Sequence, residues 1–345
     1  MREDAAPADP GVRLMDDRNP RALASARVIA FVRLGRPQFL LGGFLLFGLG
    51  AAVARSCGAA LALGPYALGQ AGITVVQLMT HYANDYFDLA ADRANATPTR
   101  FSGGSRVLPS GLLPAGAALV AARALGAAGV GLVIALALWG GPGGRTAAGL
   151  LLLAEVLAWA YSAPPAALHS RGLGELVTAV VVTGLTPLVG FVLQASGLPS
   201  SALGPALRQL GAAILPLAGL QFGMLLAIEL PDAAGDAAVG KRTLVVRLGA
   251  SRAAVLYGVS LVGVLVSIPL FALGALPLPL PPAAVLALAL PAPLALWQLW
   301  RIGTGAWRSP EHFEGLALRA VALLVASSAT ELAAFISIAS IARAH

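Results

Sequence analysis

The sequence predicts an all-α polytopic membrane protein with about nine transmembrane helices. Of its 345 residues, 58% are hydrophobic and only 11% are charged, whereas soluble domains carry roughly 25% charged residues. The mean hydropathy is +0.81, and apolar runs of roughly 17–25 residues, which are long enough to cross a bilayer core, recur along the chain. Nine such runs lie at about 38–55, 66–88, 115–139, 146–162, 174–195, 209–231, 254–274, 282–300 and 318–341.

The N-terminal residues before the first run are polar. They contain Pro7, Pro10, Pro20 and several arginines, which does not match the pattern of a cleavable signal peptide. We therefore expect residues 1–32 to form a mobile cytoplasmic tail and residues 33–345 to form a single transmembrane domain.

The distribution of basic residues predicts the orientation. If the N-terminus is cytoplasmic, all but four of the 23 Lys and Arg residues lie on that side, as the positive-inside rule requires. This predicts a multi-pass protein of the inner or plasma membrane, with its N-terminus and its active-site loops in the cytoplasm. It also explains the net charge of +7 without a nucleic-acid partner. The only cysteine, Cys57, excludes an internal disulfide and a cysteine-based metal site.

A first group of acidic residues lies where the second apolar run ends. Asn84, Asp88 and Asp92 are spaced i, i+4, i+8, and Asp85 begins an alternative set spaced i, i+3, i+7, so either set occupies one helix face. Like charges at these spacings destabilise a helix, and a carboxylate close to hydrocarbon is costly. A bound cation would relieve both penalties.

A second acidic group follows the sixth run. Asp232 and Asp236 are again four residues apart, Glu229 lies one turn earlier, and a basic, glycine-containing segment follows at 240–249. Mg²⁺ is usually held by a few carboxylates together with substrate phosphates. The two groups therefore predict a diphosphate bridged by metal ions between two pairs of aspartates. The direct donors to its oxygens would be Lys241, Arg242 or Arg106.

These motifs resemble those of the UbiA superfamily of intramembrane prenyltransferases. The resemblance extends over about residues 33–341 and is carried mainly by the two acidic segments, of which the second continues into Gly240-Lys241-Arg242-Thr243. Among the branches of the superfamily, the motifs are most similar to the menaquinone-type enzymes that prenylate a dihydroxynaphthoate. The matching segments are Asn84-Asp85-x-x-Asp88-x-x-x-Asp92, Asp232-x-x-x-Asp236, Arg36-Pro37, Tyr161-Ser162-Ala163-Pro164-Pro165 and Arg171-Gly172-Leu173-Gly174-Glu175.

The resemblance implies a Mg²⁺-dependent membrane prenyltransferase. Its helices would surround a central apolar chamber with a lateral opening to lipid, where Mg²⁺ holds an isoprenyl diphosphate and helps the diphosphate leave. The resulting allylic cation would alkylate an acceptor, usually an aromatic one. By position, Asn84, Asp88, Asp92, Asp232 and Asp236 would bind metal and diphosphate, Lys241 would neutralise the diphosphate, and Arg36, Arg106 and Tyr161 would line the site.

The chemistry agrees with this reading. Ionising an allylic diphosphate requires charge neutralisation of the leaving group and a dry chamber that protects the carbocation. We therefore expect the four aspartates to be catalytic and Asp85, Tyr161, Gln221 and Glu229 to lie in the substrate pocket. Glu229 or the released diphosphate would accept the ring proton. Gln77, His81 and Gln221 either line the chamber or form interhelical hydrogen bonds, and 102–105 is either a phosphate contact or a flexible turn.

Three alternatives remain. A cation-coupled transporter also has acids in its spans and similar halves, although usually at mid-membrane. A phospholipid-type alcohol phosphotransferase also uses membrane acids and Mg²⁺, but it has Asp-Gly and Ala-Arg in its first motif, where this chain has Asp88-Leu89 and Asp92-Arg93. The third alternative is prenyl transfer to a non-quinone acceptor such as a chlorophyllide or glycerol phosphate.

Overall fold

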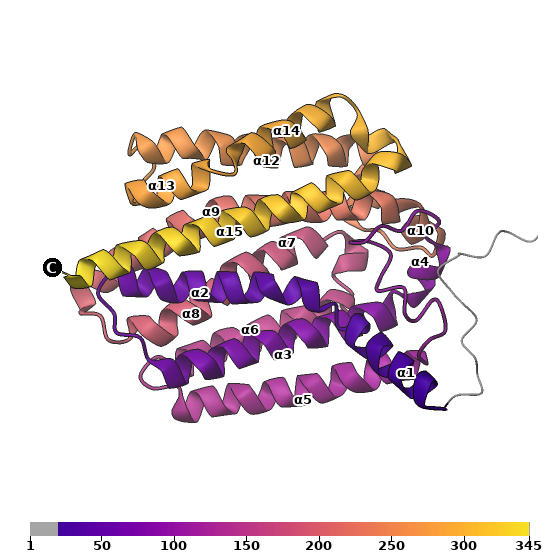
Figure 1. The fold of residues 1–345 in the computed structure, drawn as a ribbon, viewed down its shortest axis with the longest axis horizontal. Helices are drawn as coiled ribbons and strands as arrows, with labels where there is room; N and C mark the ends of the chain where they lie inside the picture. The colour runs from indigo at the N-terminus through magenta and orange to yellow at the C-terminus, as the bar shows by residue number, and fades with distance from the viewer. Residues whose placement is uncertain (1–19, 345) are drawn as a thin grey trace, which may run out of the picture.

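The computed structural model describes residues 20–344, which form an all-helical bundle without a strand (Figure 1). The long helices lie side by side along one direction, as expected for a membrane protein whose backbone polar groups must be satisfied within each helix. The long helical segments are α1 (Pro20–Leu34), α2 (Leu40–Ser56), α3 (Leu63–Phe87), α5 (Ala115–Trp139), α6 (Gly144–Ser162), α7 (Gly174–Thr178) continued by the π-helix η3 (Ala179–Leu185) and α8 (Thr186–Ala195), α9 (Ser200–Glu229), α12 (Ala250–Ala272), α13 (Pro282–Ala289) followed by α14 (Ala292–Gly303), and α15 (Phe313–Ala344).

Short elements gather between the long ones. They are α4 (Leu89–Ala94), α10 (Ala233–Ala238), α11 (Leu244–Leu248), η1 (Pro37–Phe39), η2 (His169–Arg171), η4 (Leu230–Asp232), η5 (Ala306–Arg308) and η6 (Pro310–His312). Two short α-helices, α4 and α10, carry the last aspartate of each acidic segment, α11 follows the second segment, and single 3₁₀ turns connect other elements.

Each of the nine predicted apolar runs coincides with a helix or with consecutive helices. By length and hydropathy, seven helical segments of residues 20–344 could cross a membrane, which confirms the polytopic class. The count by this criterion is seven rather than nine because α3 and α6 are not among them. Polar residues such as Gln77 and His81 lower the hydropathy of α3, and Arg145 and Glu155 lower that of α6.

The described part of the predicted N-terminal tail is helical. Residues 20–34 form α1, which packs against α3: the Tyr82 hydroxyl donates to the Phe31 carbonyl at 2.9 Å, and the centroids of the two rings are 5.0 Å apart. The rest of the predicted tail, residues 1–19, lies outside the described residues.

Glycines let neighbouring helices approach closely. A Cβ atom added to Gly50 of α2 would lie 1.8 Å from the Pro187 carbonyl oxygen of α8, and one added to Gly190 would lie 2.2 Å from the Phe47 carbonyl oxygen. Gly235 of α10 makes a similar contact, since its Cβ would lie 2.9 Å from the Asn95 nitrogen, directly after α4. These contacts hold α2 against α8 and bring the two acidic segments together.

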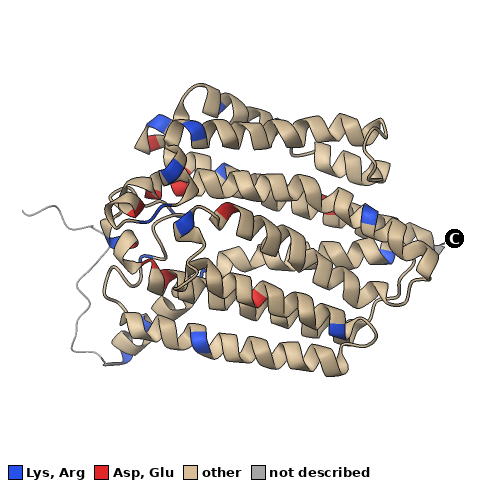
Figure 2. Ribbon diagram, turned by 180° about the vertical axis from the view of Figure 1, so that it is seen from behind, with Lys and Arg blue, Asp and Glu red and all other residues tan. Residues whose placement is uncertain are grey.

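Charged residues are concentrated at one end of the bundle. Figure 2 shows most of the acidic positions at the end where α4 and α10 lie. The two segments are about 140 residues apart in sequence, yet α4 and α10 are in contact. The polar chemistry of both halves therefore meets at one place.

Candidate active site

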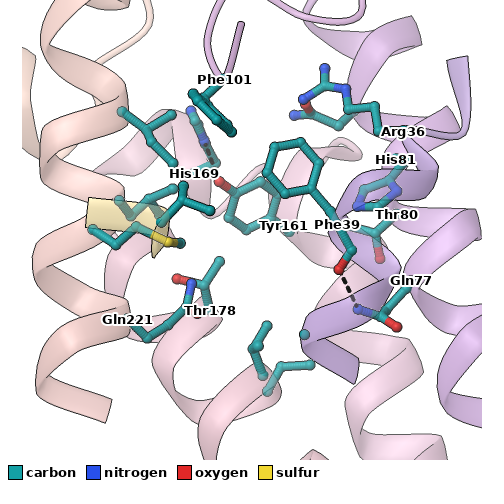
Figure 3. Close-up of a pocket in the computed structure, with 18 of the residues that line it drawn as sticks. Arg36, Phe39, Gln77, Thr80, His81, Phe101, Tyr161, His169, Thr178 and Gln221 are labelled. Atoms are coloured by element: carbon teal, nitrogen blue, oxygen red, sulfur yellow. Dashed lines mark hydrogen bonds between the residues drawn. The ribbon is translucent and has the colours of Figure 1, made fainter. Parts of the chain in front are cut away.

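A cavity of about 300 Å³ lies inside the bundle, next to the acidic end. Its apolar part is lined by side chains such as Leu46, Ile73 and Val325, from α2, α3 and α15. Its polar part is formed by the ends of α3 and α9 and by the loop of residues 95–114. Figure 3 shows the cavity, with Arg36, His169 and Tyr161 among the side chains that line it. The cavity can therefore hold a molecule with one polar end and one apolar end.

Lys241 connects the two acidic segments. Its Nζ atom lies 3.1 Å from Asp88 Oδ1 and 3.1 Å from Asp236 Oδ1. Although burial opposes the charged form, the two carboxylates raise the pKa of Lys241 above its usual value. Asn84 Nδ2 donates to the other oxygen of Asp88 at 2.6 Å. A fixed cation thus stands between the two halves, at the polar end of the cavity.

Asp92, unlike Asp88 and Asp236, has a buried carboxylate oxygen without a partner in the described chain. It is buried, and its Oδ2 atom has no hydrogen-bond partner within the described chain. Burial and the nearby Asp88 charge raise the pKa of Asp92 to about 8, although Arg36 opposes this shift. An unpartnered buried carboxylate oxygen beside a cavity is a site where a cation would be stabilising.

Asp232 is fixed by residues of the first half. Asn95 Nδ2 donates to its Oδ1 atom at 2.6 Å, and the Gly103 backbone N–H donates to its Oδ2 atom at 3.2 Å. Gly104 adopts a φ of +73°, and a Cβ atom there would lie 2.0 Å from Asp92 Oδ2. Residues 102–104 therefore lie against the carboxylates and line the cavity.

The donor set fits Mg²⁺ shared with a phosphate group. No group of three or more His, Cys, Asp or Glu side chains in residues 20–344 forms a ready-made metal site. The cavity instead presents hard oxygen donors, including the orphaned oxygen of Asp92. Mg²⁺ keeps an octahedral shell and is commonly bound through one or two carboxylates plus substrate phosphates. The candidate ligands are Asn84, Asp88, Asp92, Asp232 and Asp236, all of which line the cavity.

Four further predicted site residues also line the cavity: Arg36, Tyr161, Gln221 and Glu229. Arg36 adopts a φ of 45° at the turn between α1 and η1, and its guanidinium pairs with Asp85. Glu229 is buried at the end of α9, beside the buried carboxyl group of Glu175.

Three predicted residues lie outside the cavity lining. Asp85 is buried behind it, where it accepts hydrogen bonds from Arg36 and from the Ser105 backbone N–H, the latter at 3.1 Å. Arg106 has a φ of +62°, and its guanidinium donates to the backbone carbonyls of Asp92 and Gly103. Arg242 is exposed. Asp85 and Arg106 therefore hold the loop of residues 95–114 over the site.

Sequence reasoning missed His169. Its Nδ1 atom lies 2.9 Å from the Tyr161 hydroxyl oxygen, whereas its buried Nε2 atom has no partner in the described chain. Burial and the charge of Lys241 lower the pKa of His169 to about 4, so the imidazole is neutral. The sequence offered no signal, because a lone loop histidine has no partner at helical spacing.

Aromatic and polar side chains surround the middle of the cavity (Figure 3). The Phe39 ring is 6.1 Å from the Phe101 ring and 6.0 Å from the His81 ring, measured between centroids. His81 Nδ1 lies 2.7 Å from the Gly35 carbonyl oxygen, and Gln77 Nε2 donates to the Phe39 carbonyl at 3.5 Å. His81 and Gln77 thus both line the cavity and hydrogen-bond to the segment before α2.

Three solved structures are similar to this chain in fold. A search of curated protein sequences gives no match. Among solved structures, a UbiA homologue from Aeropyrum pernix K1 has a TM-score of 0.60 at 20% identity, covering 84% of this chain and 96% of that one. A UbiA homologue from Archaeoglobus fulgidus, bound to DMAPP and Mg²⁺, has a TM-score of 0.58 at 17% identity, covering 87% of this chain and 98% of that one. A digeranylgeranylglyceryl phosphate synthase has a TM-score of 0.57 at 16% identity, covering 91% of this chain and 98% of that one.

These structural similarities confirm the fold expected of the chain. The sequence itself matches the UbiA prenyltransferase family over residues 41–313, which is more than half of its length and includes both acidic segments. The chain therefore belongs to the UbiA prenyltransferase family.

Proposed function

We propose that the protein transfers a prenyl group from an isoprenyl diphosphate to an aromatic acceptor of the quinone-precursor type, in a Mg²⁺-dependent reaction. The observation that carries this proposal is the bridge from Lys241 to Asp88 and Asp236 at the polar end of an otherwise apolar cavity. A prenyl diphosphate has the same division into an anionic head and an apolar tail. The Archaeoglobus homologue bound to DMAPP and Mg²⁺ supports the donor class and the metal.

The residues around the polar end would bind the diphosphate. Lys241 and Arg36 supply cations, and the neutral His169 presents its free Nε2 atom to the same space. When bound, Mg²⁺ would neutralise the leaving diphosphate and so favour cleavage of the allylic C–O bond. Asn84, Asp88, Asp92, Asp232 and Asp236 would hold it.

The rest of the cavity would direct the reaction. The bonding electrons leave with the diphosphate, and the allylic cation forms beside Phe39, Phe101 and Tyr161, whose rings can stabilise positive charge. The apolar lining excludes water, which would otherwise capture the cation. The acceptor ring then forms a C–C bond with the cation, and its proton passes to Glu229 or to the released diphosphate.

The acceptor class rests on motif similarity to the menaquinone-type branch, for which a dihydroxynaphthoate is the substrate. Phe39, His81 and Thr80 offer aromatic and polar contacts to such a ring. A glycerol phosphate-type acceptor is the second candidate, favoured by the structural similarity to digeranylgeranylglyceryl phosphate synthase. A transporter is disfavoured because the paired aspartates of the cavity are grouped around Lys241 at one end of the helices rather than in mid-membrane.

We further propose that residues 33–345 are one prenyltransferase domain preceded by an N-terminal segment. The polar end of the cavity and the N-terminus would face the cytoplasm of a cell membrane. The excess of arginines at that end supports this orientation.

Product analysis tests the proposal. Purified protein in detergent would be incubated with Mg²⁺, radiolabelled geranyl diphosphate and a panel of acceptors: dihydroxynaphthoate, 4-hydroxybenzoate, homogentisate, a chlorophyllide and a glycerol phosphate. A Mg²⁺-dependent prenylated dihydroxynaphthoate would support the full proposal, and a product with another acceptor would reassign the acceptor alone. Failure to bind or convert the donor with Mg²⁺ would overturn prenyl transfer.

A further inference from the structure

Arginines and tryptophans cluster at the junction of α14 and α15. Two guanidinium groups lie near the Trp297 ring: Arg319 Cζ is 3.9 Å from the ring centroid and Arg301 Cζ is 6.0 Å from it. Arg301 also lies 5.9 Å from the Trp300 ring, and in the same region Arg308 Cζ lies 4.8 Å from the Trp307 ring. We call Trp297, Trp300, Arg301 and Arg319 the Arg–Trp cluster.

The cationic groups of this cluster have no acidic partner. Within the described residues, neither Arg301 nor Arg319 forms an ion pair with an Asp or Glu side chain. Arg319 donates to the Gly315 carbonyl at 2.9 Å and lies near Arg301, since both guanidinium groups approach the Trp297 ring. A guanidinium carries five N–H donors in a planar fork. The neighbouring guanidinium groups of Arg301 and Arg319, which have no carboxylate partner, can therefore bind an anion from outside the chain.

The surroundings of the cluster favour a lipid as the source of this anion. The cluster lies at the end of α14 and the start of α15, at the end of the bundle where α10 lies (Figure 1). Apolar side chains beside it face outward: Leu296 is 55% exposed, Trp300 57% and Leu318 45%. In a membrane, tryptophan and arginine side chains at such a boundary lie at headgroup level, with apolar neighbours against acyl chains. A free phosphate would use the arginines but not this apolar surface.

We propose that the Arg–Trp cluster binds an anionic phospholipid. The lipid phosphate would accept N–H bonds from Arg301 and Arg319, and its acyl chains would lie along Leu296 and Leu318. The rings of Trp297 and Trp300 hold the guanidinium groups in place. A zwitterionic phospholipid carries an ammonium group that offsets its phosphate, so the site selects lipids with net negative charge.

Lipid retention measured by native mass spectrometry tests this proposal. The full chain, purified in a mild detergent, would be titrated with phosphatidylglycerol or with phosphatidylcholine of the same acyl chains. We expect wild type to retain phosphatidylglycerol preferentially. The Arg301→Gln/Arg319→Gln double variant should bind it at least about tenfold more weakly, since each arginine near an anionic lipid contributes about fivefold. Equal retention of the two lipids by wild type would overturn the proposal without any variant.

A matched control separates this site from general surface charge. The Arg145→Gln/Arg208→Gln double variant removes two exposed arginines, one at the start of α6 and one in the N-terminal part of α9. It should retain phosphatidylglycerol like wild type. Equal losses in the two double variants would contradict a specific site. Because the readout is lipid mass, the result does not depend on whether the protein turns over a prenyl diphosphate.

Discussion

The acidic ends of α3 and α9 are similar in sequence, but their partners differ. At the end of α3, Asp85 is tied to Arg36 and Ser105, whereas Asp92 of α4 keeps an unpartnered buried oxygen. After α9, Asp232 has hydrogen bonds to both oxygens and Asp236 pairs with Lys241.

This difference indicates that neither acidic end is complete alone. The donors that fix Asp232, Asn95 and Gly103, come from the first half of the chain. The cation that neutralises Asp88, Lys241, comes from the second half. The repeated motif therefore builds one composite site rather than two independent ones. An incoming metal and anion would complete the coordination that Asp92 lacks.

The largest effect is expected from removing a carboxylate on either side. Asp88→Ala and Asp236→Ala should each lower kcat/KM by at least about 100- to 1,000-fold, because charge stabilisation of the leaving group is lost. Steady-state assays with geranyl diphosphate would measure this, with gel filtration to check folding. The exposed Glu311→Gln variant is the control. Full activity in either alanine variant would contradict a shared site.

Removing the cation between the halves should have a smaller effect. Lys241→Gln should raise the KM for the prenyl donor about 10- to 100-fold, since a charge-assisted hydrogen bond contributes about 1.5–3 kcal/mol. The KM for the acceptor should change much less. Arg252→Gln, at an exposed position on α12, serves as the control. An unchanged donor KM would exclude diphosphate binding by Lys241.

The loop that joins the two ends can be tested with a pair of glycines. Gly104 and Gly111 both have a φ of +73°, but only Gly104 would place a Cβ atom against Asp92, whereas nothing lies within 4 Å at Gly111. Both alanine variants carry similar backbone strain, of about 1–3 kcal/mol. Gly104→Ala should therefore lower kcat/KM about tenfold more than Gly111→Ala. Equal activities would show that the loop does not contact the carboxylates.

The smallest effect on catalysis is expected at Asp85. Asp85→Asn breaks a buried ion pair, which costs about 3–5 kcal/mol when one partner stays uncompensated. We expect a clearly lower unfolding temperature in detergent, with a much smaller loss of turnover than in Asp88→Ala. Unchanged stability together with a loss as large as that of Asp88→Ala would place Asp85 among the metal ligands instead.

The sequence predicts the helices and the two acidic segments because both signals are local. Apolar runs reveal the helices, and carboxylates beside an apolar run are costly enough to indicate a site. Spacing alone could not tell which of Asn84 and Asp85 lines the cavity, since both fit a helix face with Asp88. In the structure, Asp85 is turned away from the cavity to pair with Arg36, which is 49 residues away in sequence.

The residues that sequence reasoning placed differently depend on contacts between distant segments or on unusual backbone angles. The left-handed backbone of Arg106 accompanies a side chain bonded to loop carbonyls rather than to the cavity. His169 becomes part of the site only through the fold, which buries it beside Tyr161 and Lys241. Neither feature leaves a pattern in the local sequence.

The most direct test of a composite site is a double-mutant cycle on donor binding. The Kd of geranyl diphosphate would be measured by titration calorimetry, with and without Mg²⁺, for wild type, Asp88→Asn, Asp236→Asn and the double variant. If both carboxylates serve one metal–diphosphate site, Mg²⁺ strengthens wild-type binding, and the double variant loses little more than the weaker single variant. Losses that simply add, or wild-type binding that does not respond to Mg²⁺, would contradict the account.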